Sequence, residues 1–281
     1  ATAPLVVGLS GGGDSHALTL IAADWARAHG RRLVVLTVDH GLRPESLAWT
    51  HSCAALAARL GLEFRALHWT GEKPGQGLPA AARTARHRLL ADAARELGAR
   101  VILLGHTASD LDEAALMRAS GSTTPSPREW TPSPVWPEGR EVFLLRPLLA
   151  LGRAEIRDWL AARGESWIED PSNDDLRFAR ARARAAIAPK TVPADAAPMD
   201  DLADLARAVF VDQAGVITIP RAALSAPAAA RLIAVASLCA AGTDRPPRRD
   251  RLARLTALLN GREAVAATLC GARIEAGAVE A

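Results

Sequence analysis

The first 105 residues alternate between apolar runs and helical patterns, and this alternation restricts the fold more than any other feature of the chain. The runs are PLVVGL, RLVVLTV, LEFRALHW and RVILLG, at 4–9, 32–38, 62–69 and 100–105. Between them, apolar residues recur at helical spacing in 15–29, 45–60 and 79–98. Short continuous apolar runs are typical of strands buried in a parallel sheet. The alternation therefore predicts the βαβαβ order of a doubly wound sheet.

The region after residue 105 continues this pattern with one long interruption. We expect a helix at about 109–119, a fifth strand in EVFLLRPLL at 141–149 and a further helix at 153–163. The segment 120–139 is rich in proline, so we expect an irregular loop there. The predicted fold class is therefore α/β, with a doubly wound, mainly parallel five-stranded sheet.

The length of 281 residues favours a large domain followed by a smaller one. DPSNDD predicts a turn that caps an arginine-rich helix at 176–188, and prolines then mark a linker at 189–199. We therefore expect a large domain at 1–188 and a smaller, mostly helical domain at 200–281. The elements expected in the smaller domain are three helices and one short hairpin or strand, at 200–209, 227–241, 248–260 and 215–220.

Composition narrows the function classes. No apolar stretch is long enough to span a membrane, so we expect a soluble cytoplasmic protein without a membrane partner. Cys53, Cys239 and Cys270 are far apart and form no Cys-x-x-Cys pair, which argues against a zinc or iron–sulfur site. The pI of about 9.1 comes almost entirely from arginine. The planar guanidinium of arginine pairs well with phosphate, so this composition is compatible with binding to nucleic acid. A GC-rich genome explains the same composition.

The sequence SGGGDS, at 10–15, stands where the first strand passes to the first helix. Three glycines would let the backbone approach an anion closely, and the helix N-terminus would offer unpaired N–H groups. A Walker loop needs Gly-Lys-Ser/Thr, and a dinucleotide fingerprint needs Gly-x-Gly-x-x-Gly; both patterns are absent here. A phosphate cradle without a lysine is the prediction, and a glycine-rich turn without a ligand is the alternative.

SGGGDS resembles the signature of the PP-loop ATP pyrophosphatases. Together with VDHGLR, ARTARHRLL, GHTASDLDEAALMRASG, RPLL and WIEDPSNDDLRFARARAR, it resembles the tRNA(Ile)-lysidine synthetases. The resemblance implies that ATP, with Mg²⁺, adenylates the wobble cytidine of a tRNA(Ile) with a CAU anticodon. Free L-lysine then displaces AMP. It also implies that 1–188 is the catalytic domain and that 200–281 contacts tRNA or substrate.

The resemblance also implies an ATP site in the first half of the chain. The residues expected to bind ATP are those of the glycine loop and two arginines of one helical face, namely Ser10, Gly11, Gly12, Gly13, Asp14, Ser15, Arg83 and Arg86. Asp14 is the candidate Mg²⁺ ligand, and capping of the following helix is its alternative role. A solvated face is the alternative for the two arginines. The expected catalytic residues are Asp14, Asp39, His40 and Asp110, with His40 as a candidate general base.

Lysine binding is implied for His106, Asp110 and Glu113. The two acids share a helical face, and without the resemblance they would be surface acids at a helix N-terminus. The motif departs from the family at three positions, Ser109, Leu111 and Ala114, which puts metal and lysine binding in doubt. The arginines expected to contact tRNA are Arg43, Arg118, Arg177, Arg180 and Arg184.

The sequence is compatible with two alternative functions. A PP-loop enzyme that thiolates tRNA cytidine would share the glycine loop, but it normally needs cysteine pairs that this chain lacks. A degenerate nucleotide- or tRNA-binding module is the second alternative, because of the three departures in the acidic motif. The sequence leaves the oligomeric state open, with a homodimer as one candidate.

Overall fold

The computed structural model describes residues 3–121, 126–170, 182–183, 205, 207–212, 214–243 and 247–278. The chain divides into two compact units, 1–194 and 195–281. Within the described ranges, no helix is both long and apolar enough to cross a membrane.

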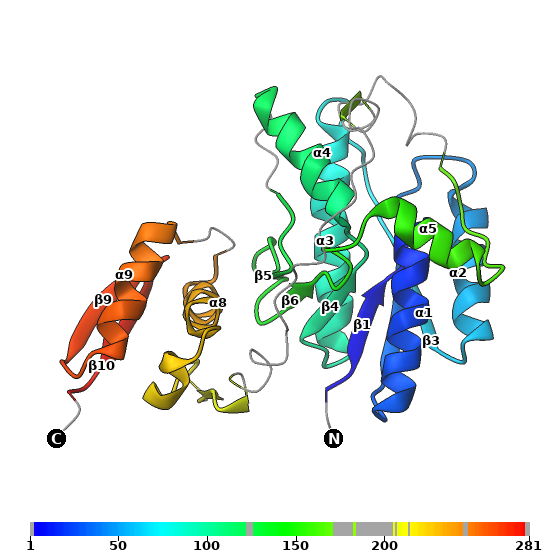
Figure 1. Cartoon of the computed structure of the whole chain (residues 1–281). Coiled ribbons are helices and arrows are strands. Elements are labelled where there is room, and N and C mark those ends of the chain that lie inside the picture. The colour runs from blue at the N-terminus through cyan, green and yellow to red at the C-terminus, as the bar shows by residue number, and fades with distance from the viewer. Residues whose placement is uncertain are drawn as a thin grey trace. The chain divides into compact units, whose positions relative to one another are not determined.

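The N-terminal unit is built on one six-stranded sheet (Figure 1). Its strands are β1 (Leu5–Gly8), β2 (Leu33–Asp39), β3 (Glu63–His68), β4 (Val101–Leu104), β5 (Trp130–Pro132) and β6 (Phe143–Leu145). The strand order is β3-β2-β1-β4-β6-β5, and every pair is parallel except β5 with β6. The predicted parallel strands are therefore confirmed.

The short strand β5 corrects the expectation of an irregular loop over 120–139. It lies at the sheet edge, where the missing N–H of Pro132 costs no ladder hydrogen bond. The ring of Trp130 packs 4.4 Å from that of Phe143, between centroids, so this tryptophan belongs to the sheet. Trp136 is 64% exposed.

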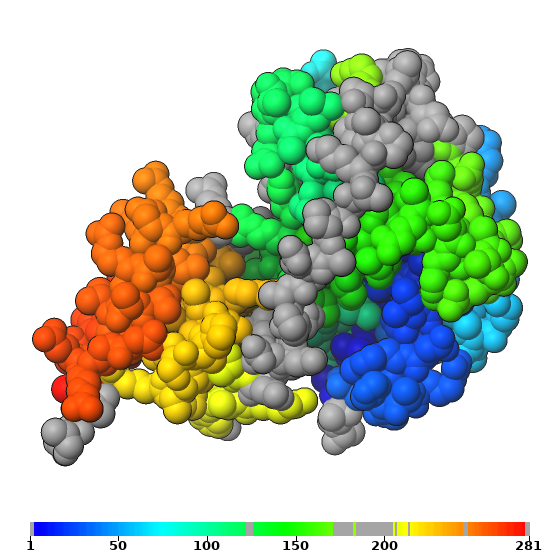
Figure 2. All heavy atoms as spheres, in the orientation of Figure 1, coloured from blue at the N-terminus to red at the C-terminus, as the bar shows by residue number. Residues whose placement is uncertain are grey.

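Helices cover both faces of the sheet. Their bounds are α1 (Gly13–Ala28), α2 (Ser46–Arg59), α3 (Leu78–Glu96), α4 (Ala108–Ala119) and α5 (Arg153–Ala161). Val7 faces a core formed with α1, α2 and α5, whereas its neighbour Val6 faces a core formed with α3. This alternation is expected for strands whose side chains point to opposite faces. Helix α5 packs against α1, and the two helices form adjoining surface in Figure 2.

The strand order places a topological switch point between β1 and β4. The chain winds from β1 outward to β3, and then returns to β4 on the other side of β1. Ligands of doubly wound folds bind beyond the carboxyl ends of strands at such a point. The loops that follow β1 and β4 are therefore the expected walls of a binding site.

The C-terminal unit has its own small core, formed by Leu224, Ile233, Leu255, Leu259 and Leu269. Its elements are β7 (Phe210–Val211), β8 (Ile217–Thr218), a 3₁₀ helix η2 (Arg221–Ser225), α8 (Ala229–Ala241), α9 (Arg249–Asn260), β9 (Val265–Leu269) and β10 (Ala272–Ala276). Helices α8 and α9 match the predicted ones at 227–241 and 248–260. The hairpin of β9 and β10 was not predicted. The helices expected at 176–188 and 200–209 lie largely outside the described residues.

Candidate active site

The three glycines of the loop after β1 have different environments. Gly11 has a φ of +87°, and a Cβ on it would lie 2.4 Å from Cδ1 of Ile168. Gly12 and Gly13 line the cleft above the sheet, and a Cβ on Gly12 would have no neighbour closer than 3.7 Å. Gly11 is therefore required by the backbone and by packing, whereas Gly12 leaves room for a ligand at the start of α1.

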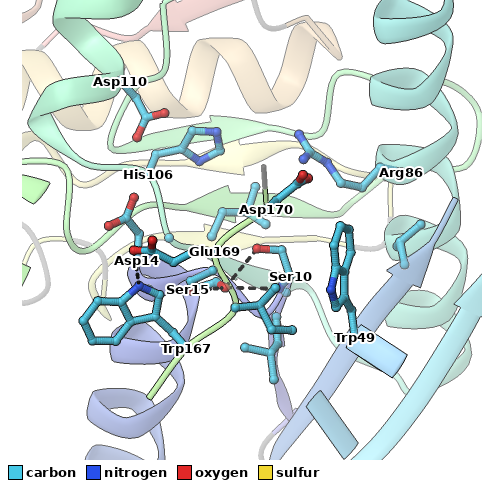
Figure 3. A pocket seen from close by; sticks show the side chains of 18 of the residues that line it. Ser10, Asp14, Ser15, Trp49, Arg86, His106, Asp110, Trp167, Glu169 and Asp170 are labelled. Carbon is cyan, nitrogen blue, oxygen red and sulfur yellow. Dashed lines mark hydrogen bonds between the residues drawn. The ribbon is translucent and has the colours of Figure 1, made fainter. Parts of the chain in front are cut away.

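The two serines of the loop hold it closed. The Ser15 hydroxyl donates to the carbonyl of Gly12 over 2.9 Å and accepts from the amide of Ser10 over 3.1 Å. The hydroxyl oxygens of Ser10 and Ser15 are 3.0 Å apart (Figure 3). Because the single hydroxyl proton of Ser15 is directed to Gly12, the Ser10 hydroxyl is the donor in the contact between the two serines, and it must turn away from Ser15 to donate to an anion in the cleft.

The loop after β4 packs directly on the glycine loop. A Cβ on Gly105 would lie 2.8 Å from the amide nitrogen of Ser15, so only glycine fits there. Helix α4 then begins at Ala108, and Asp110 in its first turn has a carboxylate that accepts from the amide of Thr107 over 2.8 Å and faces its hydroxyl at 3.1 Å. This capping contact fixes the carboxylate of Asp110 at the cleft wall.

Three carboxylates gather around one guanidinium in this cleft. The guanidinium of Arg153, the first residue of α5, donates from Nε to Asp14 over 3.1 Å and from Nη1 to Glu113 over 3.0 Å. Its Nη2 lies 3.8 Å from the carboxylate of Asp110. The side chain of Glu113 is only 1% exposed. The structure therefore brings together the predicted acids Asp14, Asp110 and Glu113, and Figure 3 shows Asp14 and Asp110 on the same side of the cleft.

Burial controls the electrostatics of this cluster. It raises the pKa of Asp14, and the neighbouring Arg153 offsets part of that effect. Arg153 in turn has a raised pKa because the favourable charges of the three acids outweigh its own desolvation. The cluster is thus a partly desolvated anionic site that already holds one cation.

Asp39 and His40 lie at the end of β2, as expected, and both line the cleft. The carboxylate of Asp39 accepts from the amide of Gly41 over 2.8 Å and lies 3.5 Å from Nδ1 of His68. Burial, followed by the nearby charge of Arg86, lowers the pKa of His40. His40 therefore stays neutral at physiological pH, which is the form required of a general base.

The helix α3 forms the opposite wall. Arg86 lines the cleft, as does Trp49, and Figure 3 shows Arg86 across the cavity from Asp14. Arg83 is not among the lining residues, although it lies on the same helix. Its charge instead acts on His87, whose pKa falls to about 2 mainly because of burial.

The predicted tRNA contacts are only partly described. Arg43 is half-buried and lines the cleft. Arg118 is exposed on α4 and donates from Nε to the carbonyl of Ala114 over 3.2 Å. The other three expected arginines lie outside the described residues, namely Arg177, Arg180 and Arg184.

The segment 165–168 is a wall that the sequence did not predict. The amide of Ile168 donates to the carbonyl of Gly11 over 2.9 Å, and the ring of Trp167 lies over Gly13. Glu165 anchors this segment, because its carboxylate lies 2.9 Å from Nε2 of His16 and accepts two hydrogen bonds from Arg59. The hydrogen bonding from Arg59 is the main reason that the pKa of Glu165 is lowered.

Arg153 was also missed, although the sequence carried a signal for it. A basic residue in the first turn of a helix opposes the helix dipole, so its role is expected to lie outside that helix.

The cleft that these residues enclose has a volume of about 1470 Å³, enough for a nucleotide and a second substrate. His106 lines it beside Asp110.

A magnesium ion fits this cleft only together with phosphates. Among the described residues, no three His, Cys, Asp or Glu side chains are placed to hold a metal by themselves. Nucleotide-bound Mg²⁺ commonly needs only one or two carboxylates, since phosphates and waters complete its shell. Asp14, at the glycine loop, is placed to supply one such carboxylate.

Comparison with known proteins agrees with this geometry. The family model of the PP-loop domain matches residues 2–191. The chain is 55% identical over 275 residues to a tRNA(Ile)-lysidine synthase of Caulobacter vibrioides, covering 98% of this chain and 65% of that protein. It is 36% identical over 294 residues to the synthase of Hyphomonas neptunium, covering 97% of this chain and 79% of that protein. The chain thus spans a little under two thirds of the first relative.

A solved structure shares the fold. The U34-tRNA thiolase NcsA from Methanococcus maripaludis, solved with its [4Fe-4S] cluster, superposes with a TM-score of 0.55. The two sequences are 16% identical, and the match covers 65% of this chain and 64% of the thiolase. At this identity the likeness extends to the fold alone.

Proposed function

Because this chain belongs to the tRNA(Ile)-lysidine synthases, a family of PP-loop proteins, we propose that it joins free L-lysine to C2 of the wobble cytidine in a CAU-anticodon tRNA(Ile). In the first step, O2 of the cytidine attacks the α-phosphorus of ATP and pyrophosphate leaves. In the second step, the ε-amino nitrogen of lysine attacks C2, and AMP leaves with that oxygen. A tRNA substrate assigns the reaction to the cytoplasm.

The glycine loop supports the first step. The N–H groups in the first turn of α1 lack intrahelical partners, and the residues that carry them, Gly13, Asp14 and Ser15, line the cleft. Aimed at pyrophosphate, they would stabilise the charge that grows on the leaving group. When bound, Mg²⁺ would neutralise part of that charge, and Asp14 would hold it. Arg86 would contact the nucleotide from the opposite wall.

The acids of α4 support the second step, and their burial is the observation that carries the proposal. Asp110 and Glu113 are both buried and share the cleft with the glycine loop. Buried carboxylates need a cation, and the ε-ammonium group of lysine is one. The amine must lose a proton before it attacks, and neutral His40 lines the same cleft and could accept it.

One assay tests this function. The purified protein is incubated with ATP, Mg²⁺, radiolabelled lysine and an unmodified CAU-anticodon tRNA(Ile), and both AMP release and lysine in the tRNA are measured. We expect equal amounts of the two products. Release of AMP without labelled tRNA would contradict lysidine formation, and absence of both products would favour a binding module.

The thiolating alternative finds no support in the cysteines. Cys53 belongs to the N-terminal unit, whereas Cys239 and Cys270 belong to the C-terminal unit. Burial raises the pKa of Cys53 and raises that of Cys239 to about 12, which disfavours the thiolate in both. The same assay with a sulfur donor in place of lysine separates the two activities.

A further inference from the structure

The amine site of the proposed function is already occupied by a side chain of the protein. Arg153 donates to Glu113 over 3.0 Å and lies 3.8 Å from Asp110, the two carboxylates proposed to bind the lysine ammonium. The same guanidinium donates to Asp14 over 3.1 Å at the glycine loop. One cation thus bridges the nucleotide side and the amine side of the cleft.

The backbone of Arg153 is fixed against α4. Its amide donates to the hydroxyl of Ser109 over 3.4 Å, and the amide of Ala108 donates to the carbonyl of Leu151 over 2.9 Å. Ser109 is one of the three positions at which the acidic motif departs from the family, and its hydroxyl here contacts the start of α5. With its backbone held, Arg153 can change partners only by moving its side chain.

A guanidinium and an ammonium group compete for the same carboxylate oxygens. Arg153 has a second class of partner within reach, because Gly12 and Gly13 line the same cleft and Asp14 already holds the Nε end of the guanidinium. Arginine pairs strongly with phosphate oxygens through its planar fork. A bound triphosphate would therefore attract the guanidinium away from α4.

We infer that Arg153 is a positioning residue that closes the amine site until nucleotide binds: it holds Asp110 and Glu113 in the free enzyme and transfers to the phosphates of ATP, which leaves both carboxylates to the ammonium of lysine. This inference rests on the proposed function and adds an order to it, with nucleotide before amine. The exchange replaces one cation on the carboxylates by another, so the charge of the buried cluster is conserved.

The test measures lysine binding to the full chain, with and without a non-hydrolysable ATP analogue and Mg²⁺, by equilibrium dialysis. Wild-type protein should bind lysine about tenfold more tightly with the analogue, which is within the usual range of coupling between two sites. Arg153→Gln should bind lysine in the free state as tightly as wild type does with the analogue, and the analogue should change that affinity less than twofold. Arg163→Gln is the matched control. It removes a guanidinium that lies over the Trp159 ring at 3.8 Å, and it should behave as wild type.

Arg153→Lys keeps a cation at this position and is the variant to test if Arg153→Gln does not fold. It should still bind lysine more tightly with the analogue than without it. The inference is overturned if either Arg153→Gln retains the full nucleotide dependence or free Arg153→Gln binds lysine more weakly than free wild type. Equal lysine affinity of Arg153→Lys with and without the analogue would also overturn it. Failure of wild-type protein to bind lysine in either state would overturn the amine site itself, and the proposed function with it.

Discussion

Gly105, directly after β4, packs against Ser15 of α1 so closely that a Cβ on Gly105 would lie 2.8 Å from the Ser15 amide nitrogen. The same Cβ would lie 2.9 Å from the backbone carbonyl of Asp14. Both neighbours are backbone atoms, which cannot rotate away as a side chain can. This contact sets the spacing between the glycine loop and the acids of α4.

Gly105→Ala should therefore displace α4 from the glycine loop. We expect a loss of about 1–3 kcal/mol in the free energy of unfolding, typical of overpacking in a filled site. All seven tryptophans lie in the N-terminal unit, so tryptophan fluorescence during urea unfolding reports on that unit alone. Gly75→Ala is the control, since a Cβ there has no neighbour within 4 Å and should change stability by less than about 0.5 kcal/mol. Equal effects of the two substitutions would show that the close contact carries no constraint.

The acids at the two ends of the cluster around Arg153, Asp14 and Glu113, should act in different steps of the reaction. Asp14→Asn should abolish AMP formation, because it removes the carboxylate at the glycine loop. Glu113→Gln should retain AMP formation and raise the KM for lysine at least about tenfold, since a charged hydrogen bond in a buried site is worth more than ~1.4 kcal/mol. Both rates are measured in the assay described above.

Asp24→Asn is a matched control on α1, because the Asp24 side chain is 77% exposed. It should leave both rates unchanged. If Asp14→Asn and Glu113→Gln reduced AMP formation and lysine transfer by the same factor, the assignment of the two acids to different steps would be wrong.

Much of the N-terminal unit could be predicted because its signals are local. The apolar runs at 4–9 and 32–38 became β1 and β2 within one residue at most ends, and the pattern at 153–163 became α5. These elements are specified by periodicity within short windows. The glycine loop was equally local, and so was the shared face of Asp110 and Glu113.

The contacts of Arg153 and Glu165 could not be predicted in that way. Arg153 meets Asp14 across 139 positions of sequence, and Glu165 meets His16 across 149. Neither pair has a spacing rule, because tertiary packing alone brings them together. As long as the contact with Arg153 is unknown, Asp110 and Glu113 look like ordinary surface acids at the start of a helix. The sequence alone therefore could not decide between surface acids and a binding site for an amine.

The missed hairpin of β9 and β10 has a different cause. Val265, Ala267 and Leu269 alternate toward the core, but small alanines weaken the alternating pattern. The turn is formed by Cys270 and Gly271, both with positive φ, at 56° and 96°. Such two-residue turns favour Asn-Gly or Asp-Gly, so a Cys-Gly turn gave no recognisable signal.

The pKa of His40 should depend on Arg86 across the cleft. Burial is the larger cause of its lowered pKa, and the positive charge of Arg86 is the second. Arg86→Gln should therefore raise the pKa of His40, measured by NMR titration of its imidazole. Arg88→Gln is the control, because Arg88 lies on the same helix but pairs with Glu138. A pKa of His40 that stays constant or falls in Arg86→Gln would contradict this electrostatic link.

His87 should make the N-terminal unit less stable in mild acid. It is 2% exposed, and its pKa is lowered to about 2, whereas the unfolded chain takes up a proton near pH 6.5. Below pH 6.5 the unfolded state therefore binds more protons than the folded state, so stability falls as pH falls. Between pH 7 and pH 5 this one group should cost about 2 kcal/mol.

His87→Leu removes the titrating group and fills a similar volume in the core. Urea unfolding followed by tryptophan fluorescence should therefore show about 2 kcal/mol less loss between pH 7 and pH 5 in this variant than in wild type. His51→Gln, at an exposed position of α2, is the control and should keep the wild-type dependence on pH. Parallel curves for His87→Leu and wild type would mean that His87 titrates alike in the folded and unfolded states, against the burial that the structure shows.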